Sequence, residues 1–282
     1  MNRAQWSIVI ASILLVVVLY AATKNQFFGE RKAKVETPGV NQQPQELTTD
    51  SILFYSKQNL TPEQIARLNQ LENSISRGDV MNQKVQLYHQ LAHFWADSAK
   101  VFAPYAYYTG EAARLVNSEN SLTFAAHLFL DDLTNTEDPR LKQWEALQAK
   151  DLFERSLKLN QNNDSSKVGL GAVYLYGGLA SPMEGIGMIR SVVEKDSGNV
   201  YAQMTLGKAS LLSGQIDKAV ERFKKVAQLH PDNMEAILLL ADTYEKMGNN
   251  AAAAEWYQRS LPLISRPDLK QEVEKRITQL KK

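Results

Sequence analysis

Of the residues in this sequence, two histidines one helical turn apart have the spacing best suited to binding a metal. His89 and His93 stand at positions i and i+4, as two zinc ligands on one helix do. In the corresponding zinc-protease motif, the residue after the first histidine is a glutamate that acts as general base, whereas here it is Gln90, which cannot accept a proton. We therefore predict that both histidines are structural and hold no metal. An enzyme with a metal site built from His89, His93 and nearby acids is the alternative.

The other residues that could do chemistry stand in patterns that favour packing or solvation. They are His127, His230, the acidic pairs Asp131-Asp132 and Glu137-Asp138, and the aromatic run from Phe102 to Tyr108. Isolated surface acids are usually solvated, and aromatic residues at helical spacing usually belong to a core, although such a run can also bind a partner. Phosphate-binding loops and nucleophile elbows are absent from the sequence. We expect no catalytic residue and no cofactor.

Composition excludes further classes of function. The chain has 282 residues, a formal net charge of +1, 44% hydrophobic residues and no cysteine. Because the chain has no cysteine, disulfides, thiol nucleophiles and cysteine-ligated metals are excluded. The balanced charge provides no basic field for nucleic acid, so we expect no nucleic-acid partner.

An uncharged apolar stretch at the start of the chain predicts a transmembrane anchor over residues 1–23. The run from Ala4 to Thr23 lies between Arg3 and Lys24, and as a helix it would be about 30 Å long, close to one hydrocarbon thickness. A cleaved signal peptide is the alternative. Lysines and arginines after the run favour a cytoplasmic body, but a lone N-terminal anchor commonly exports the domain behind it. We expect a single-pass membrane protein with a periplasmic or extracytoplasmic body, joined to the anchor by a polar linker at 24–58.

The body repeats itself with a period of about 34 residues. Leu206-Gly207 is matched by Leu240-Ala241, 34 residues later, and by Leu170-Gly171, 36 residues earlier. The longer interval requires two extra residues in one turn. Small residues let paired helices approach closely, and a large apolar residue four positions after the second small one fills the gap. The repeat-defining residues are Gly171, Tyr174, Gly207, Ala219, Phe223, Pro231, Ala241, Tyr244, Ala253 and Tyr257.

This pattern resembles the tetratricopeptide repeat, which reads Leu-Gly-x-x-Tyr, then Ala-x-x-x-Phe, then Pro. The leading tryptophan of that family is missing, since Gln203 stands in its place in one copy. The resemblance implies an all-α, right-handed solenoid of helical hairpins. We place degenerate repeats at 59–163, with about eleven extra residues near Thr134 to Arg140, three good repeats at 164–265 and a polar capping helix at 266–282.

The resemblance also implies a peptide groove lined by the first helix of each repeat. The candidate groove residues at the family's positions are Val168, Tyr176, Tyr201, Met204, Lys208, Leu211, Leu212, Leu238 and Asp242. The family's clamp for acidic chaperone tails needs lysine and asparagine where this chain has Met204 and Lys208, so that ligand is disfavoured. The mixture predicts a groove for an apolar or aromatic peptide, and packing between repeats is the alternative role.

Together these observations predict a membrane-anchored, non-catalytic adaptor that binds a protein or peptide partner. Bacterial envelope assembly, maturation or secretion is the expected context. Apart from the metal-dependent enzyme, a self-assembling structural protein is an alternative, which the charged last helix argues against. The sequence leaves the oligomeric state open.

Overall fold

The computed structural model describes residues 47–75, 81–179 and 181–282, and within them it is built from helices with no β-strand. These residues belong to one compact unit, Gln45–Lys282. The expected all-α fold is confirmed. In chain order the elements are α2 (Thr49–Lys57), α3 (Pro62–Ile75), α4 (Met81–His93), the π-helix η1 (Phe94–Ala99), α5 (Phe102–Val116), α6 (Glu119–Leu133), α7 (Pro139–Leu159), α8 (Asp164–Tyr176), α9 (Pro182–Lys195), α10 (Val200–Leu212), α11 (Ile216–Leu229), α12 (Met234–Lys246), α13 (Asn250–Ser260), the 3-10 helix η2 (Leu261–Leu263) and α14 (Pro267–Leu280).

The expected single-pass anchor and the localisation built on it need correction. Among the described helices, none is both long enough and apolar enough to cross a bilayer. The longest, α7, has 21 residues and carries acidic and basic side chains along its whole length, which makes burial in hydrocarbon costly. The predicted segment 1–23 lies outside the described residues.

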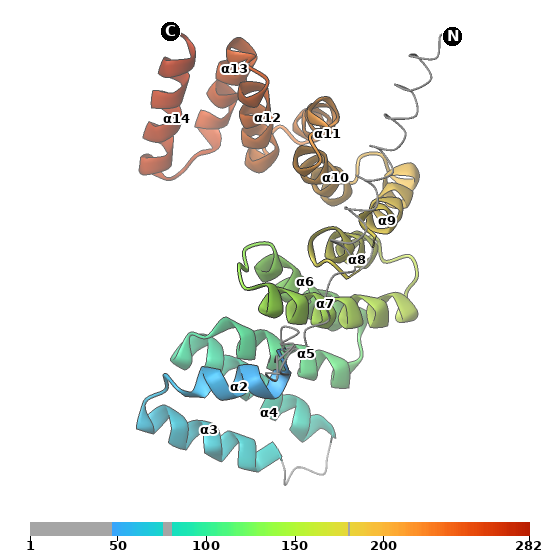
Figure 1. Cartoon of the computed structure of the whole chain (residues 1–282), viewed down its shortest axis with the longest axis vertical. Helices are drawn as coiled ribbons and strands as arrows, with labels where there is room; N and C mark the ends of the chain where they lie inside the picture. Colours follow the sequence, from blue (N-terminus) through green and yellow to red (C-terminus); the bar gives the residue numbers. More distant parts are fainter. Residues whose placement is uncertain (1–46, 76–80, 180) are drawn as a thin grey trace, which may run out of the picture. The chain divides into compact units, whose positions relative to one another are not determined.

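Consecutive helices pack as antiparallel pairs, α4 with α5, α6 with α7, α8 with α9, α10 with α11 and α12 with α13 (Figure 1). The first helices of the last three pairs begin at Asp164, Val200 and Met234, which are 36 and then 34 residues apart. This spacing agrees with the repeat seen in the sequence, including the two extra residues in one turn.

Each of these first helices starts at an asparagine cap. Asn163, Asn199 and Asn233 precede α8, α10 and α12, and the side-chain oxygen of each accepts a hydrogen bond from the backbone amide three residues later, at 2.8, 3.0 and 2.9 Å. Such a cap satisfies an amide that has no partner within the helix and contributes about 1 kcal/mol. The same residue type therefore sets the start of every good repeat.

Small residues allow the paired helices to touch backbone to backbone. A Cβ atom on Gly171 of α8 would lie 2.8 Å from the carbonyl oxygen of Gly185 on α9, and one on Gly185 would overlap the carbonyl oxygen of Gly171. Ile189, four residues after Gly185, is fully buried beside this crossing. The next pair repeats the arrangement, because a Cβ atom on Gly207 would overlap the ring of the buried Phe223.

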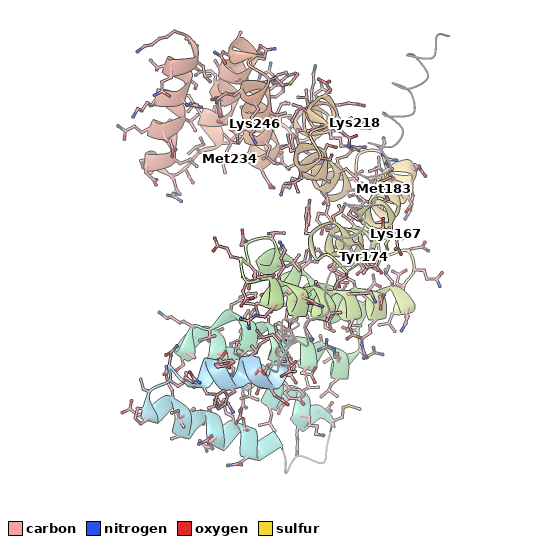
Figure 2. All side chains as sticks on the ribbon, in the orientation of Figure 1. Lys167, Tyr174, Met183, Lys218, Met234 and Lys246 are labelled. Carbon is pink, nitrogen blue, oxygen red and sulfur yellow. The ribbon has the colours of Figure 1, made fainter. Side chains whose placement is uncertain are left out.

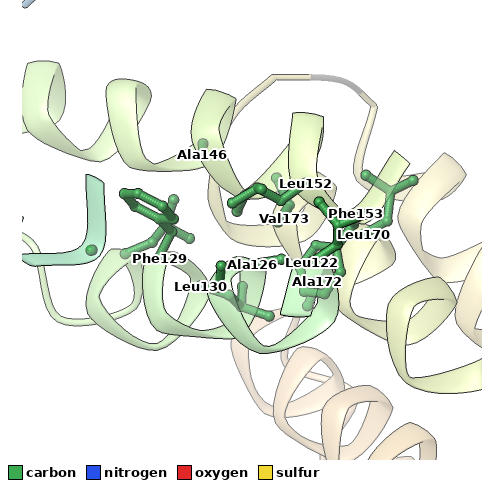
Figure 3. Close-up of a cluster of buried hydrophobic side chains, with 14 of the residues drawn as sticks. Leu122, Ala126, Phe129, Leu130, Ala146, Leu152, Phe153, Leu170, Ala172 and Val173 are labelled. Atoms are coloured by element: carbon green, nitrogen blue, oxygen red, sulfur yellow. The ribbon is translucent and has the colours of Figure 1, made fainter. Parts of the chain in front are cut away.

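Most of the other repeat-defining residues are also buried. Tyr174, Ala219, Ala241, Ala253 and Tyr257 are each less than 9% exposed, whereas Tyr244 is half-buried and Pro231 lies exposed in a turn. The weaker copies contribute to the core in the same way, and α6, α7 and α8 enclose a large apolar cluster (Figure 3). Phe129, Leu152 and Phe153 in that cluster are fully buried. Stacked pairs thus cover one another's apolar faces.

Helix α2 lies within the range 24–58 that the sequence assigns to a linker. Ile52 of α2 is 5% exposed and joins the cluster formed by α5 to α8. The indole Nε1 of Trp144 donates a hydrogen bond to Thr49 Oγ1 at 3.0 Å, although the two residues are 95 positions apart. A helix of nine residues is too short to show a clear apolar periodicity in the sequence, and this one is held by contacts with distant residues.

The last helix, α14, packs against α13. Val273 and Ile277 are buried in the cluster shared with α12 and α13, and the remaining face is mainly charged. This arrangement suits the polar end cap expected for residues 266–282, because it closes the last apolar face and leaves charges toward water.

Two glycines on α9 provide a matched test of the helix crossing. Gly185→Ala should lower the free energy of unfolding by about 1–3 kcal/mol, because its Cβ meets backbone that cannot move aside. Gly187→Ala, whose Cβ meets nothing within 4 Å, should raise it by about 0.5–1 kcal/mol through helix propensity. Urea unfolding followed by circular dichroism measures both changes, and equal effects would contradict the close crossing.

Candidate functional site

A cavity of about 700 Å³ opens along the first helices of successive repeats. Helices α6, α8 and α10 supply most of its lining, and α7 contributes one lysine. Helix α12 contributes another, Lys246, whose side chain is labelled in Figure 2. We call it the main cavity. Its lining residues are Leu130, Asp131, Thr134, Lys142, Ala172, Leu175, Tyr176, Tyr201, Thr205, Lys208, Leu211, Leu212 and Lys246.

The floor of the main cavity is apolar and aromatic. Tyr201, Lys208 and Leu212 follow one face of α10, at spacings of seven and four residues. Leu175 and Tyr176 end α8 beside them. Leu212 is 76% exposed, the highest value among the exposed large hydrophobic residues of the described chain. This exposed apolar surface can bind apolar side chains of another molecule.

Tyr201 packs against His127, which in turn packs against Phe153. The ring centroid of His127 lies 5.4 Å from that of Tyr201 and 5.1 Å from that of Phe153, both edge to face. His127 Nε2 is 3.0 Å from Ser165 Oγ. Burial lowers the pKa of His127, against the opposing effect of Asp131, so the imidazole is neutral near pH 7. A fixed tyrosine loses little conformational entropy on binding, which favours a ligand contact.

The tyrosine hydroxyls at this site are hydrogen-bond donors. Burial raises the pKa of Tyr176 to about 12 and that of Tyr201 further still, so both phenols keep their protons. Within the described residues neither hydroxyl has a hydrogen-bond acceptor, although both side chains line the main cavity. A ligand that supplies an acceptor oxygen there would satisfy them.

One wall of the main cavity comes from the extra residues between α6 and α7. The turn carries Thr134, and α7 begins early at Pro139 behind an Asp138 cap that accepts the Arg140 amide at 2.9 Å. The added length of α7 brings Lys142 to the cavity. The insertion that disturbs the repeat therefore builds part of the site.

A buried carboxyl ties this wall to the core. Glu145 of α7 is fully buried, and Thr136 Oγ1 of the turn donates a hydrogen bond to its Oε2 at 2.8 Å. Burial, together with the neighbouring Asp132 carboxyl, raises the pKa of Glu145 to about 8. Glu145 is therefore mainly protonated at neutral pH.

The structure separates the predicted groove residues into three groups. Tyr176, Tyr201, Lys208, Leu211 and Leu212 line the main cavity, and their part in binding stays a prediction.

Val168 and Met204 do not belong to a groove, which corrects the sequence analysis. Val168 is fully buried among residues that include Ile189 and Ala202, and Met204 is 5% exposed in the cluster that contains Phe223. Both stand at the fifth position of a repeat, which here faces the neighbouring helix pair instead of the open face.

Leu238 and Asp242 lie in a separate cavity with Tyr257 and residues of α14. The hydroxyl of Tyr257 donates its one proton to Asp242, and Glu245 Oε2 lies 3.1 Å from the same oxygen. Asp242 is thus engaged within the chain, and the burial and this hydrogen bond raise the pKa of Tyr257. This end of α12 is packed against the capping helix.

Sequence reasoning missed several residues of the main cavity. Lys246 and the pair Leu130 and Asp131 occupy the twelfth or thirteenth position of their repeats, so the positional rule could have found them had it been carried through. Thr134 belongs to the insertion, Lys142 lies at the start of α7 just after it, and neither follows a repeat position. No sequence signal identifies those two.

The paired histidines lie outside this site. His89 and His93 are exposed, and the Nδ1 atom of His93 is 3.4 Å from a carboxylate oxygen of Asp97. In the described part of the chain, no three His, Cys, Asp or Glu side chains are grouped so that they could hold a metal ion.

Comparison with known proteins agrees with this geometry. Residues 210–264 match the family model described as "Tetratricopeptide repeat". The structure is similar to TTC0263, a thermophilic TPR protein of Thermus thermophilus, with 15% identity, coverage of 71% of this chain and 98% of that chain, and a TM-score of 0.50. It is also similar to pilF of Pseudomonas aeruginosa, with 15% identity, 71% and 85% coverage and a TM-score of 0.48.

A curated relative matches over a shorter stretch. The Protein CTR9 homolog of Arabidopsis thaliana is 30% identical over 88 residues, which are 29% of this chain and only 8% of that protein. Residues 210–264 therefore match the tetratricopeptide repeat, and the described helices share the all-α repeat fold of a solved protein of this type.

The raised pKa of Glu145 predicts how stability depends on pH. Because the folded chain holds this proton more tightly than the unfolded chain, the carboxyl's contribution to stability is fully present below its ordinary pKa of 4.5 and is lost as the pH rises through about 8. As the pH rises between those values, the parent chain loses this stability and the Glu145→Gln variant does not. The free energy of unfolding of the variant minus that of the parent should therefore increase by at least about 1 kcal/mol. Urea unfolding across this pH range measures it. The exposed Glu137→Gln in the same turn is the control, and parallel pH profiles for all three chains would contradict the assignment.

Proposed function

We propose that this chain is a non-catalytic adaptor that binds an extended segment of a protein partner in the main cavity. The observation that carries the proposal is the uncovered apolar surface of the main cavity, where Leu212 is largely exposed in a lining that also contains Tyr176 and Tyr201. Helical repeats of this class bind partners through such surfaces because each repeat presents the same helix face to one side.

The composition of the floor supports a peptide over a small polar molecule. Fully burying one leucine side chain is worth roughly 1.5–3 kcal/mol, and aromatic residues are frequent among the residues that dominate binding energy. The main cavity is open and is lined mainly by three successive first helices, which suits a chain segment with several anchors. Bacterial envelope assembly, maturation or secretion is the context we propose for the partner, on the basis of the sequence analysis alone.

Photo-crosslinking at two exposed apolar positions tests the proposal. A photoreactive phenylalanine derivative at position 212 should capture a discrete partner in cells, because Leu212 lies in the main cavity. The same residue at position 183 should capture none, because Met183, 66% exposed, lies outside that cavity (Figure 2). Adding Tyr201→Ala should reduce the crosslinked product at least about 10-fold, since loss of a central aromatic anchor costs about 2 kcal/mol.

Circular dichroism of each variant confirms that the fold is retained. Equal capture from positions 212 and 183, or capture that is indifferent to Tyr201→Ala in a folded chain, would contradict binding at the main cavity.

A further inference from the structure

We propose that the partner segment of the main cavity is acidic as well as apolar, and that lysines at the cavity recognise its carboxylates. This inference rests on the proposed function, because it names the chemistry of the ligand for the same site. The lysines concerned are Lys142 of α7 and Lys246 of α12.

The charges at the main cavity have an excess of positive groups. Its lining includes three lysines and one acid, Asp131. Lys208 Nζ forms an ion pair with Glu235 Oε1 at 2.6 Å, outside the lining. Lys142 and Lys246 form no ion pair within the described residues, so their ammonium groups are free to bind an anion.

The acids beside these two lysines are engaged by other groups. Asp242, which lines a smaller cavity with Lys246 and Glu245, accepts a hydrogen bond from Tyr257, and Asp132 is the carboxyl that interacts with Glu145. Glu145, which lies close enough to Lys142 to interact electrostatically, is mainly protonated because burial raises its pKa. Glu245, next to Lys246 in the sequence, is engaged by Arg276, whose Nε donates to its Oε2 at 2.9 Å. Asp131 is the acid that faces the cavity, so the balance there is positive.

The tyrosine hydroxyls add donors of the same kind. Tyr176 and Tyr201 present phenol groups without an acceptor in the described chain. A wholly apolar ligand would take these hydroxyls and the ammonium groups out of water without replacing their hydrogen bonds, which is costly. A basic ligand would add repulsion from the lysines. Carboxylates beside apolar side chains satisfy both the donors and the floor.

Selection from a random peptide library displayed on phage tests this inference with the full chain as bait. Peptides that bind the parent chain should be rich in apolar residues and should contain more aspartate and glutamate than the unselected library. A selected peptide and its amide twin, in which every glutamate is glutamine and every aspartate is asparagine, are then compared by fluorescence anisotropy. The acidic form should bind at least about 5-fold more tightly, as expected for two partly exposed ion pairs.

Lysine variants assign the preference to this site. Lys142→Gln together with Lys246→Gln should bring the two dissociation constants together and weaken the dependence on salt. Lys218→Gln is the control, because Lys218 is exposed on α11 and does not line the main cavity (Figure 2). It should leave the preference unchanged.

The outcomes separate this inference from the proposed function. Peptides that lose binding with Tyr201→Ala but show no acidic excess, or bind equally as acid and amide, overturn the acidic preference and leave peptide binding intact. An acidic preference that survives the double lysine variant also overturns the inference. Failure to select any peptide whose binding depends on Tyr201 overturns both.

Discussion

The close crossing of paired helices at small residues is the contact on which this structure depends. Gly171 and Gly185 bring α8 and α9 together with no room for a side chain between their backbones, and Ile189 fills the space beside them. In the next pair, Gly207 of α10 instead leaves room for the buried ring of Phe223 of α11. Because the crossing fixes how the two helices of a pair are rotated about their axes, it also decides which face of the first helix remains open.

The asparagine caps carry that constraint from one repeat to the next. Each cap starts the first helix at the same point relative to the small residue, so equivalent positions fall on equivalent faces. Tyr176 and Leu212, both at the thirteenth position, therefore line the same cavity, although they are 36 residues apart. The alignment of equivalent positions along one cavity thus follows from regular packing.

The insertion between α6 and α7 departs from the regular repeat and contributes to the main cavity. The insertion before α7 adds Thr134 to the main cavity, the start of α7 adds Lys142, and the buried Glu145 holds the insertion against the core. A carboxyl kept protonated by burial can anchor such a turn without placing an uncompensated charge in the interior. The wall, one of the cavity lysines and the predicted pH dependence of stability thus share one structural origin.

The sequence by itself determined the helical class, the spacing of the good repeats and the residues at the helix crossings. These features depend on contacts between neighbours that recur at fixed intervals, so they leave a periodic trace. The positional rule also found Tyr201, Lys208 and Leu212, which lie in the main cavity. It failed for Val168 and Met204, because burial of the fifth position depends on how tightly the next pair packs.

Only the tertiary structure decided the rest. Helix α2 is held by Trp144 and by burial of Ile52, contacts between distant residues that no local pattern reveals. The same holds for Lys142, which reaches the cavity because an insertion lengthens α7. The expectation of an anchored protein came from hydropathy alone, and no described helix can span a membrane. Local periodicity records which residues face a neighbouring repeat, whereas the contents of a cavity depend on segments that meet only when the chain has folded.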